Sequence, residues 1–186
     1  MCKNRSQIRA MYAINAQQGF SIIEMMIAVT ILAIAATVAV PAYSQFIGNT
    51  QIRSTTESIK NGIQLARAEA VKRNARVIFT LAANTSWSVG CTVVDAVNCP
   101  LVIQSKAANE GSAGSVSVAL VGNNNITFTS LGTLDTNVLG QLSQVNIDHK
   151  TIPAQYTKDL RIIIGAGGNV RMCDPNVSAT TDTRRC

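Results

Sequence analysis

The sequence predicts an α+β protein in which one long N-terminal helix precedes a region of short β-strands. An apolar run of membrane length, 20–43, continues into a pattern of helical periodicity up to residue 74. Residues 75–186 then alternate β-branched runs with turns rich in Gly and Asn. The 186 residues are 47% hydrophobic and 14% charged, with a net charge of +6. This composition excludes a disordered chain, and five Cys are too few for a small disulfide-dense scaffold.

Residues 1–19 form a basic, polar leader. They contain Lys3, Arg5 and Arg9 and no acidic residue. A basic segment ahead of an apolar helix stays in the cytoplasm, so we expect the chain after it to be exported. The sequence shows no small-residue cleavage site of the secretory type after the apolar run, and the sharper change in composition falls between Gly19 and Phe20.

The segment 20–43 is long and apolar enough to cross a membrane. Of its 24 residues, 19 are hydrophobic, and Glu24 carries its only charge. At about 1.5 Å per residue, the uncharged stretch 25–43 spans roughly the 30 Å hydrocarbon core of a bilayer. A carboxylate inside an apolar run costs about 2.5 kcal/mol or more in lipid. We therefore expect Glu24 either to lie hydrated at the membrane surface or to have a functional partner.

The second half of the helix, residues 44–74, is amphipathic. Its apolar residues recur at helical spacing and form a stripe that should pack against a sheet: Ile52, Ile59, Ile63, Ala66 and Ala70. Pro41, between the two halves, should kink or locally break the helix. Asn74 precedes a β-branched run and is expected to end the helix.

The region 75–186 is predicted to contain six to eight short strands. Apolar or alternating runs predict strands at 76–81, 87–94, 100–103, 116–121, 126–129, 160–164 and 169–173. The glycine-rich stretch 165–168 should turn the last two of these into a hairpin. The polar stretch 148–157, which includes the only histidine, His149, is expected to be a loop.

The junction Gly19-Phe20-Ser21-Ile22-Ile23-Glu24, followed directly by the membrane-length run, resembles the N-terminus of the type IV pilin superfamily of pilins and type II secretion pseudopilins. The resemblance implies that a prepilin peptidase cleaves after Gly19 and that the new amine of Phe20 is methylated. Glu24 matches the acid of the family near the mature N-terminus, and Pro41 matches a proline of the family. The resemblance also implies that Glu24 pairs with the Phe20 amine of a neighbouring subunit during assembly.

Within this superfamily the chain resembles the GspH/FimT branch. The residues that carry this resemblance are the helical stretch 65–73, the run 126–128 ahead of Gly132, and the two C-terminal runs 161–164 and 168–173. The resemblance implies a pilin-like fold, in which a long N-terminal helix packs on antiparallel β-sheets. The transmembrane and assembly half would be residues 20–43, the amphipathic half 44–74, and the head 75–186.

Four of the five cysteines lie in the exported part, because Cys2 belongs to the leader. An even number of cysteines in an oxidising compartment suggests two disulfides, for which three pairings are open. We favour Cys91 with Cys99, which closes a short loop, and Cys173 with Cys186, which pins the C-terminal tail. Neither spacing is typical of zinc ligands, so we expect no metal site.

The sequence contains no catalytic motif. The patterns G-x-S-x-G, P-loop and H-E-x-x-H are absent, and His149 has no nucleophile motif nearby. We therefore expect neither an enzyme nor a bound cofactor.

The exported part is modestly basic, with 13 basic and 9 acidic residues from residue 45 onward. Some GspH/FimT-like minor pilins bind DNA through basic residues near the C-terminus, and here Arg161, Arg171, Arg184 and Arg185 would contact phosphates. The match is partial, because Asn169 stands where the DNA-binding pattern G-R-x-R has its first Arg. Aromatic residues for base stacking are also few. A solvated basic rim or a contact between subunits is the alternative.

The sequence therefore predicts a minor pilin-like structural subunit that primes or caps assembly of a type IV pilus. A type II secretion pseudopilin and a DNA-binding minor pilin for natural transformation are the alternatives. The expected partners are other pilin or pseudopilin subunits, the prepilin peptidase and the inner membrane, with DNA as a further candidate. We expect a single-pass protein of the bacterial inner membrane with its head in the periplasm, exposed on the cell surface once assembled in a pilus. The disulfides, the charged tail and the lack of an acidic calcium cluster favour the pilus.

Overall fold

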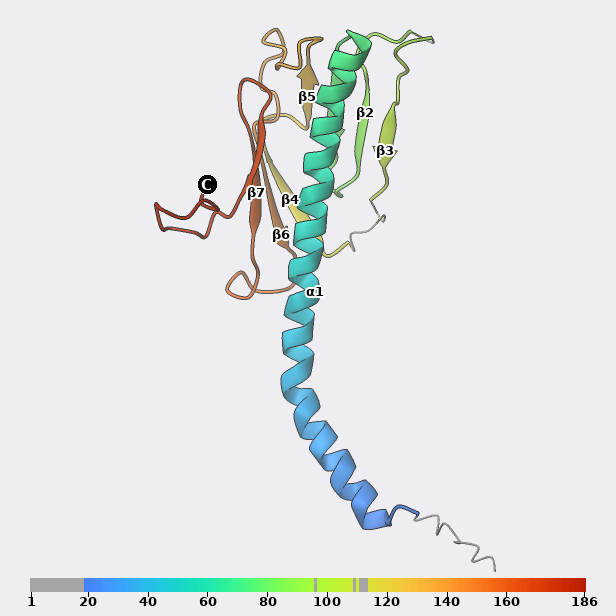
Figure 1. Cartoon of the computed structure of the whole chain (residues 1–186), viewed down its shortest axis with the longest axis vertical. Helices are drawn as coiled ribbons and strands as arrows, with labels where there is room; N and C mark the ends of the chain where they lie inside the picture. The colour runs from blue at the N-terminus through green and yellow to red at the C-terminus, as the bar shows by residue number, and fades with distance from the viewer. Residues whose placement is uncertain (1–18, 96, 109, 111–113) are drawn as a thin grey trace, which may run out of the picture. The chain divides into compact units, whose positions relative to one another are not determined.

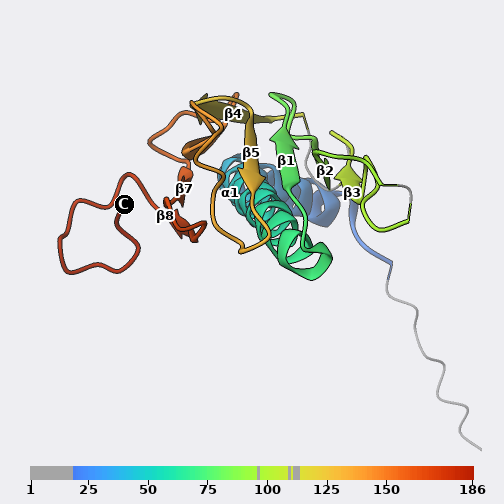
Figure 2. The same ribbon diagram turned by 90° about the horizontal axis from the view of Figure 1, so that it is seen from above.

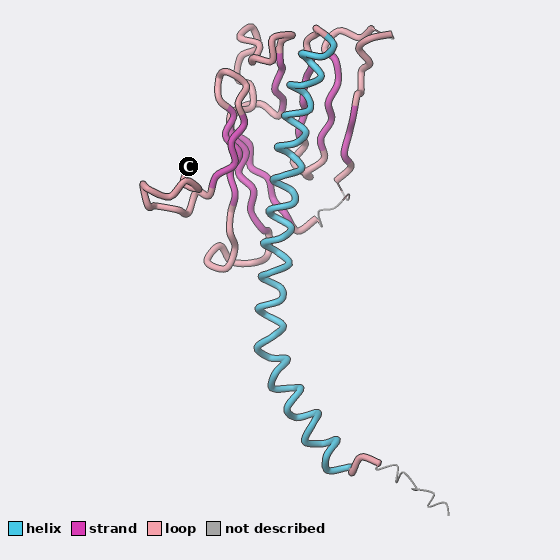
Figure 3. Tube along the Cα trace, viewed as in Figure 1, coloured by secondary structure: helices cyan, strands magenta, loops and turns pink. Residues whose placement is uncertain are grey.

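The computed structural model describes residues 19–95, 97–108, 110 and 114–186. The predicted leader therefore lies outside the described residues, apart from Gly19. The chain divides into two compact units, Met1–Val40 and Pro41–Cys186, and the second unit contains all of the strands. The described residues form one helix and eight strands (Figures 1 and 3).

The helix α1 (Ile22–Arg73) is 52 residues long. It continues through Pro41 without interruption, so the local break expected there does not form. Proline removes only its own N–H from the ladder, and the hydrogen bonds on either side continue the helix. The predicted end is confirmed: Asn74 has a left-handed φ of 48°, and the Ala75 N–H donates to the Ala70 carbonyl at 3.1 Å.

Two four-stranded antiparallel sheets form the head. The first has the order β3 (Gln104–Lys106), β2 (Trp87–Cys91), β1 (Val77–Leu81), β5 (Asn125–Phe128). The second has the order β4 (Val116–Val121), β6 (Gln144–His149), β7 (Leu160–Ile164), β8 (Val170–Cys173). Seen from above, the strands curve around α1, from β3 on one side over β1 and β5 to β7 and β8 on the other (Figure 2).

The predicted stripe of α1 is the centre of the core. Its five residues, Ile52 to Ala70, have no exposed surface. They pack in one cluster with inward-facing residues of both sheets, among them Phe79, Phe128 and Ile162. Small residues let the sheet approach closely: a Cβ on Gly62 would lie only 2.8 Å from the Phe79 ring. The predicted α+β fold of one long helix packed on antiparallel sheets is confirmed.

The prediction of a strand at residues 100–103 is wrong, because the third strand is formed by residues 104–106 instead. The earlier segment does hydrogen-bond to β2, since the Cys91 N–H donates to the Pro100 carbonyl at 3.1 Å and the Ile103 N–H donates to the Val89 carbonyl at 2.8 Å. Between these two bonds it has one residue more than β2, so the ladder is irregular. The Leu101 carbonyl oxygen lies 1.8 Å from where a Cβ on Gly90 would be, so only glycine fits there. The second predicted strand is also shorter than expected, since β2 ends at Cys91.

The expected loop at residues 148–157 is wrong at its start, because Asp148 and His149 belong to β6. Burial alternates along this strand, with Val145, Ile147 and His149 facing the core. The His149 Nδ1 accepts the Ile152 N–H at 3.1 Å and the Thr151 N–H at 3.3 Å, which shapes the turn that follows. His149 thus occupies an inward-facing strand position. An apolar residue at this position would have extended the alternating pattern that predicts a strand, whereas a histidine does not.

Candidate functional site

The predicted cleavage and assembly residues lie at the start of α1. Gly19 and Phe20 precede the helix and are exposed. The Met25 N–H donates to the Ser21 carbonyl at 3.1 Å, which makes Ser21 the N-cap residue and Glu24 the third residue of the helix. A Ser followed three residues later by Glu is the capping-box spacing. The sequence interpretation did not consider this spacing between Ser21 and Glu24.

The first half of α1 has no packing partner among the described residues. Every side chain from Ser21 to Ser44 is exposed, although most are apolar. The most apolar 18-residue window has a mean hydropathy of 2.4, and the helix is long and apolar enough to cross a membrane. An exposed apolar surface of this extent requires lipid or other subunits around it.

A disulfide joins Cys91 to Cys99, with their Cα atoms 5.6 Å apart. Within this loop, Asp95 and Cys99 exchange both backbone hydrogen bonds at 2.8 Å. The Val97 N–H and the Asn98 side chain donate to the Asp95 carboxylate and lower the pKa of Asp95. Cys91 with Cys99 is one of the two pairs favoured from the sequence.

The same loop is tied to the end of α1. The Arg73 guanidinium donates to the Asn98 carbonyl and also to Glu69 at 2.6 Å. Burial opposes ionisation of Glu69, but hydrogen bonds from Arg73 and Lys72 outweigh it and lower the pKa of Glu69. This ion-pair cluster connects the last turn of α1 to the disulfide loop.

A second disulfide joins Cys173 to Cys186, with Cα atoms 5.1 Å apart, and holds the C-terminal tail against β8. The Asp174 N–H donates to the Arg184 carbonyl at 2.7 Å beside this bond. The Arg171 guanidinium donates to the carbonyls of Arg185 at 3.3 Å and Cys186 at 3.1 Å. The tail is thus fixed both covalently and by hydrogen bonds.

The four arginines considered for DNA binding are only partly brought together. Arg171 and Arg161 lie on the same face of β7 and β8, because Arg161 pairs with Cys173 and Ile163 pairs with Arg171. Arg161, however, donates to the Asn146 side chain at 2.7 Å. Arg184 pairs with Asp182 at 2.7 Å, and this bond lowers the pKa of Asp182 to about 2. Three of the four guanidiniums are therefore engaged within the chain.

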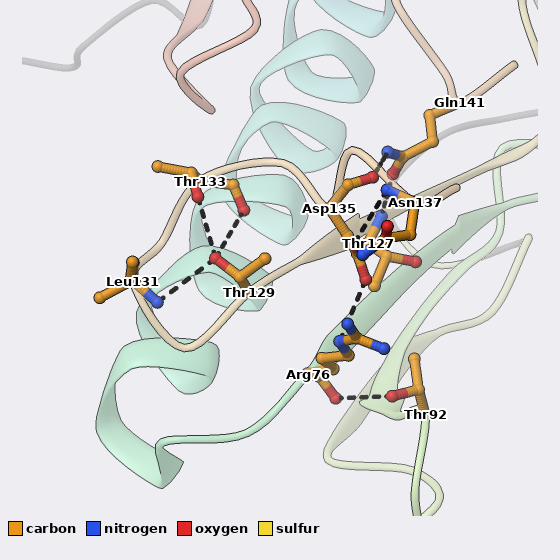
Figure 4. A network of polar contacts seen from close by, with 9 residues as sticks. All are labelled: Arg76, Thr92, Thr127, Thr129, Leu131, Thr133, Asp135, Asn137 and Gln141. Atoms are coloured by element: carbon orange, nitrogen blue, oxygen red, sulfur yellow. Dashed lines mark hydrogen bonds and ion pairs between the residues drawn. The ribbon is translucent and has the colours of Figure 1, made fainter. Parts of the chain in front are cut away.

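A polar network around the buried Thr127 and Asp135, which the sequence did not predict, closes the free edge of β5 (Figure 4). The Thr127 N–H donates to the Gln141 side chain at 2.6 Å, and the Asp135 N–H donates to the Thr127 carbonyl at 2.9 Å. The buried Asp135 carboxylate accepts Asn137 at 3.0 Å and pairs with Arg76 at 3.1 Å. These groups take the place of a neighbouring strand, which protects the sheet edge from pairing with another chain.

No cluster of three or more metal-ligating side chains occurs in the part of the chain that the structure describes. An open polar groove runs between α1 and the first sheet, lined by Ser54, Glu57, Ser58, Asn61, Gly62, Leu65, Trp87 and Gln104. The Trp87 indole N–H donates to the Ser58 hydroxyl at 3.1 Å across it. These side chains include no histidine, cysteine or lysine.

An exposed apolar helix that continues into the core of a two-sheet head defines the pilin class of architecture. A family model described as "Type II transport protein GspH" matches residues 55–182, and one described as "Prokaryotic N-terminal methylation motif" matches residues 14–40. The chain belongs to the GspH family. The resemblance to the pilin superfamily and its GspH/FimT branch is thereby confirmed.

Comparison with known proteins finds similarity to two pilins and to one pseudopilin. The type IV major alpha-pilin of Moraxella bovis is 30% identical over 78 residues, which are 42% of this chain and 49% of that protein. The chain thus spans about half the length of this curated relative. The type IV minor pilin FimU of Pseudomonas aeruginosa superposes with a TM-score of 0.51 at 16% identity, over 72% of this chain and 99% of that one. The minor pseudopilin EpsH of Vibrio cholerae superposes with a TM-score of 0.49 at 11% identity, over 68% and 99%.

Proposed function

We propose that this chain is a minor subunit of a type IV pilus, anchored in the inner membrane by the first half of α1 and assembled through it, that primes or caps the filament. The observation that carries the proposal is the exposed apolar half of α1, joined to a head whose own core is closed. Such a helix exchanges lipid for the helices of other subunits without any change in the head. The head would lie in the periplasm and present its surface to neighbouring subunits.

Processing at Gly19 and Phe20 is part of this proposal. Both residues lie outside α1 and are exposed, so a peptidase and a methylating enzyme could reach the peptide bond and the new amine. We expect mass spectrometry of the membrane-extracted protein to find a chain that begins at Phe20 and carries one methyl group. An unprocessed N-terminus in cells with an active prepilin peptidase would contradict the proposal.

The test of assembly is substitution of Glu24. In lipid the carboxylate is costly, and pairing with the Phe20 amine of a neighbouring subunit would remove that cost. We expect Glu24→Ala to insert in the membrane normally but to be nearly absent from sheared filaments. Glu24→Gln is the matched control, because glutamine keeps the size of the side chain and is equally suited to this position of a capping box, but it lacks the charge. Failure of both variants would implicate the charge, failure of Glu24→Ala alone would implicate the helix cap, and normal incorporation of both would exclude the proposed pairing.

A role as a type II secretion pseudopilin is the second candidate, and the description of the matched family supports it. The two machines share helix-driven assembly, so the helix does not discriminate between them. Deletion of the gene followed by assays of surface piliation and of protein secretion would separate the two roles. Loss of secretion with normal piliation would replace the pilus proposal by the pseudopilin one.

DNA binding remains a prediction that rests on the basic residues near the C-terminus. The exposed Arg185 and the charge of Arg171 would supply phosphate contacts, while Arg184 is already paired with Asp182. A mobility-shift assay with duplex DNA and the detergent-solubilised full chain tests it. Absence of a shift even at low salt, where phosphate contacts are strongest, would exclude this role.

A further inference from the structure

Residues 150–158, which make up most of the loop that joins β6 to β7, are held at one defined height along the second half of α1. We call this segment the basal loop. The Lys158 N–H donates to the Asn49 Oδ1 at 2.7 Å, and the Asn49 side chain donates to the Tyr156 carbonyl at 3.4 Å. A Cβ on Gly48 would lie 2.4 Å from the Ile152 Cδ1, so the loop rests on a helix position that has no side chain. Figure 1 shows this loop beside α1 at the lower end of the sheets.

This height coincides with the edge of the apolar run. The uncharged apolar stretch ends at Tyr43, and Gly48 and Asn49 lie five and six residues beyond it. At the helical rise these residues are about 7–9 Å past Tyr43 along the axis. The polar headgroup layer on each side of a bilayer is roughly 5–8 Å thick. Tyr43, Asn49 and the basal loop belong to the same compact unit, so a hydrocarbon boundary at Tyr43 would lie within about 9 Å of the helix residues that hold the loop, close to the outer limit of the headgroup layer.

The chemistry of the exposed side chains fits that position. Tyr43, Phe46 and Tyr156 are 67%, 66% and 49% exposed, and aromatic residues favour the membrane–water interface. Lys150 and Lys158 are also exposed, and ammonium groups near a bilayer surface are attracted to anionic lipids.

Two neighbouring carboxylates, those of Asp148 and Asp159, are less exposed than these lysines. Asp148 and Asp159 are half-buried and share the Thr157 hydroxyl, which donates to Asp159 at 3.0 Å. Burial, together with the adjacent Asp148, raises the pKa of Asp159. The Lys150 ammonium donates to the Gly114 carbonyl at 2.6 Å, and both lysines are exposed.

We propose that the basal loop, together with Tyr43 and Phe46, binds the headgroups of anionic phospholipids and so orients the head on the membrane before the subunit enters a filament. This contact rests on the membrane anchoring put forward as part of the proposed function. It adds a second, reversible attachment whose strength depends on lipid charge. Extraction of the subunit into a filament would then have to break it.

The test uses the full chain in vesicles of phosphatidylcholine with and without phosphatidylglycerol. Tyr156→Trp places an indole on the basal loop, and lipids spin-labelled at the headgroup quench it on contact. Leu131→Trp is the matched control: residue 131 is 82% exposed, and the adjacent Gly132 packs on Arg67, about 36 Å past Tyr43 along the helix. The parent chain, with Trp87 alone, supplies the background.

We expect at least threefold stronger quenching for Tyr156→Trp than for Leu131→Trp, rising with the fraction of phosphatidylglycerol. Adding Lys158→Glu should remove the dependence on anionic lipid, whereas Lys158→Arg should keep it. Both substitutions leave the backbone N–H that binds Asn49 intact.

Equal quenching at the two positions in inserted protein would overturn the inference, and so would quenching independent of lipid charge. Protection of the introduced indole that grows with the protein-to-lipid ratio would also overturn it, because a second copy would then cover the loop. Resistance to carbonate extraction, measured on the same vesicles, shows whether the chain is inserted in the membrane. Extraction by carbonate would mean that the proposed membrane anchoring has failed, which is a different result from absence of lipid binding by the basal loop.

Discussion

Residues 22–43 and residues 44–73 of α1 form one unbroken helix, but their side chains have opposite surroundings. In the first half all side chains are exposed, including bulky ones such as Ile34. In the second half a stripe that includes Ile59 and Ile63 is fully buried against the sheets. The first half therefore depends on lipid or other subunits, whereas the second half is stabilised within the chain. Helical structure alone does not reveal this difference.

The two glutamates of α1 show the same contrast. Glu69 forms ion pairs with Arg73 at 2.6 Å and Lys72 at 3.2 Å. Glu24 has no basic side chain within ion-pair distance among the residues that the structure describes. Glu69 is thus paired within the subunit, whereas the partner proposed for Glu24 belongs to a neighbouring subunit.

The largest expected effect on stability comes from substituting one isoleucine in each half of α1 and comparing the results. Ile59→Ala should lower the free energy of unfolding of the head by about 2–5 kcal/mol, because it leaves a cavity in a closed core. Ile34→Ala should change it by less than about 0.5 kcal/mol, because that side chain touches nothing in the head. Urea unfolding of the full chain in detergent, followed by the fluorescence of Trp87, measures both. A comparable loss for Ile34→Ala would refute the contrast.

The disulfides should give the next largest effect, again confined to the head. Replacing Cys173 and Cys186 by Ser should cost about 3 kcal/mol, and replacing Cys91 and Cys99 by Ser slightly less, because the closed loops are short. The same urea titration reads the loss, and neither pair of substitutions should alter carbonate-resistant insertion. If either did, the head and the membrane half would be energetically coupled.

The smallest effect concerns pH and Glu69. Its pKa is lowered in the folded protein, so its contribution to stability is present above about pH 4.5 and is lost as the pH falls through the folded pKa. Glu69→Gln should cost about 1 kcal/mol at neutral pH and should flatten the fall in stability below pH 4.5. Glu24→Gln should leave the stability curve of the head unchanged. An equally steep acid transition in Glu69→Gln would assign the loss to other carboxylates.

Local patterns in the sequence predicted much of this protein. The membrane-length run, the buried stripe from Ile52 to Ala70 and the helix end at Asn74 all depend on residues a few positions apart. The hairpin of β7 and β8 follows in the same way, because Gly168, with a φ of 77°, supplies the turn. Such features are visible in a single sequence because helices and tight turns are short-range structures.

Other features escaped the sequence because they depend on residues far apart in the chain. His149 was interpreted as a loop residue, since only its pairing with Val116 on β4 makes it an inward position of a strand. The polar network around Asp135 and Gln141 was missed because its residues matter only where β5 lacks a neighbour. The segment 100–103 looked like a strand until its close approach to Gly90 was known.

The sequence by itself determined that this chain has one helix able to cross a membrane, a β-rich head and the N-terminal junction of a pilin-like protein. These conclusions follow from hydropathy, periodicity and spacing, which act locally. Only the tertiary structure decided which charges are engaged within the subunit, which sheet edge is closed and how high the basal loop lies on α1. Those properties arise from contacts across as many as 109 positions of sequence, such as that of Lys158 with Asn49, and no local pattern encodes them.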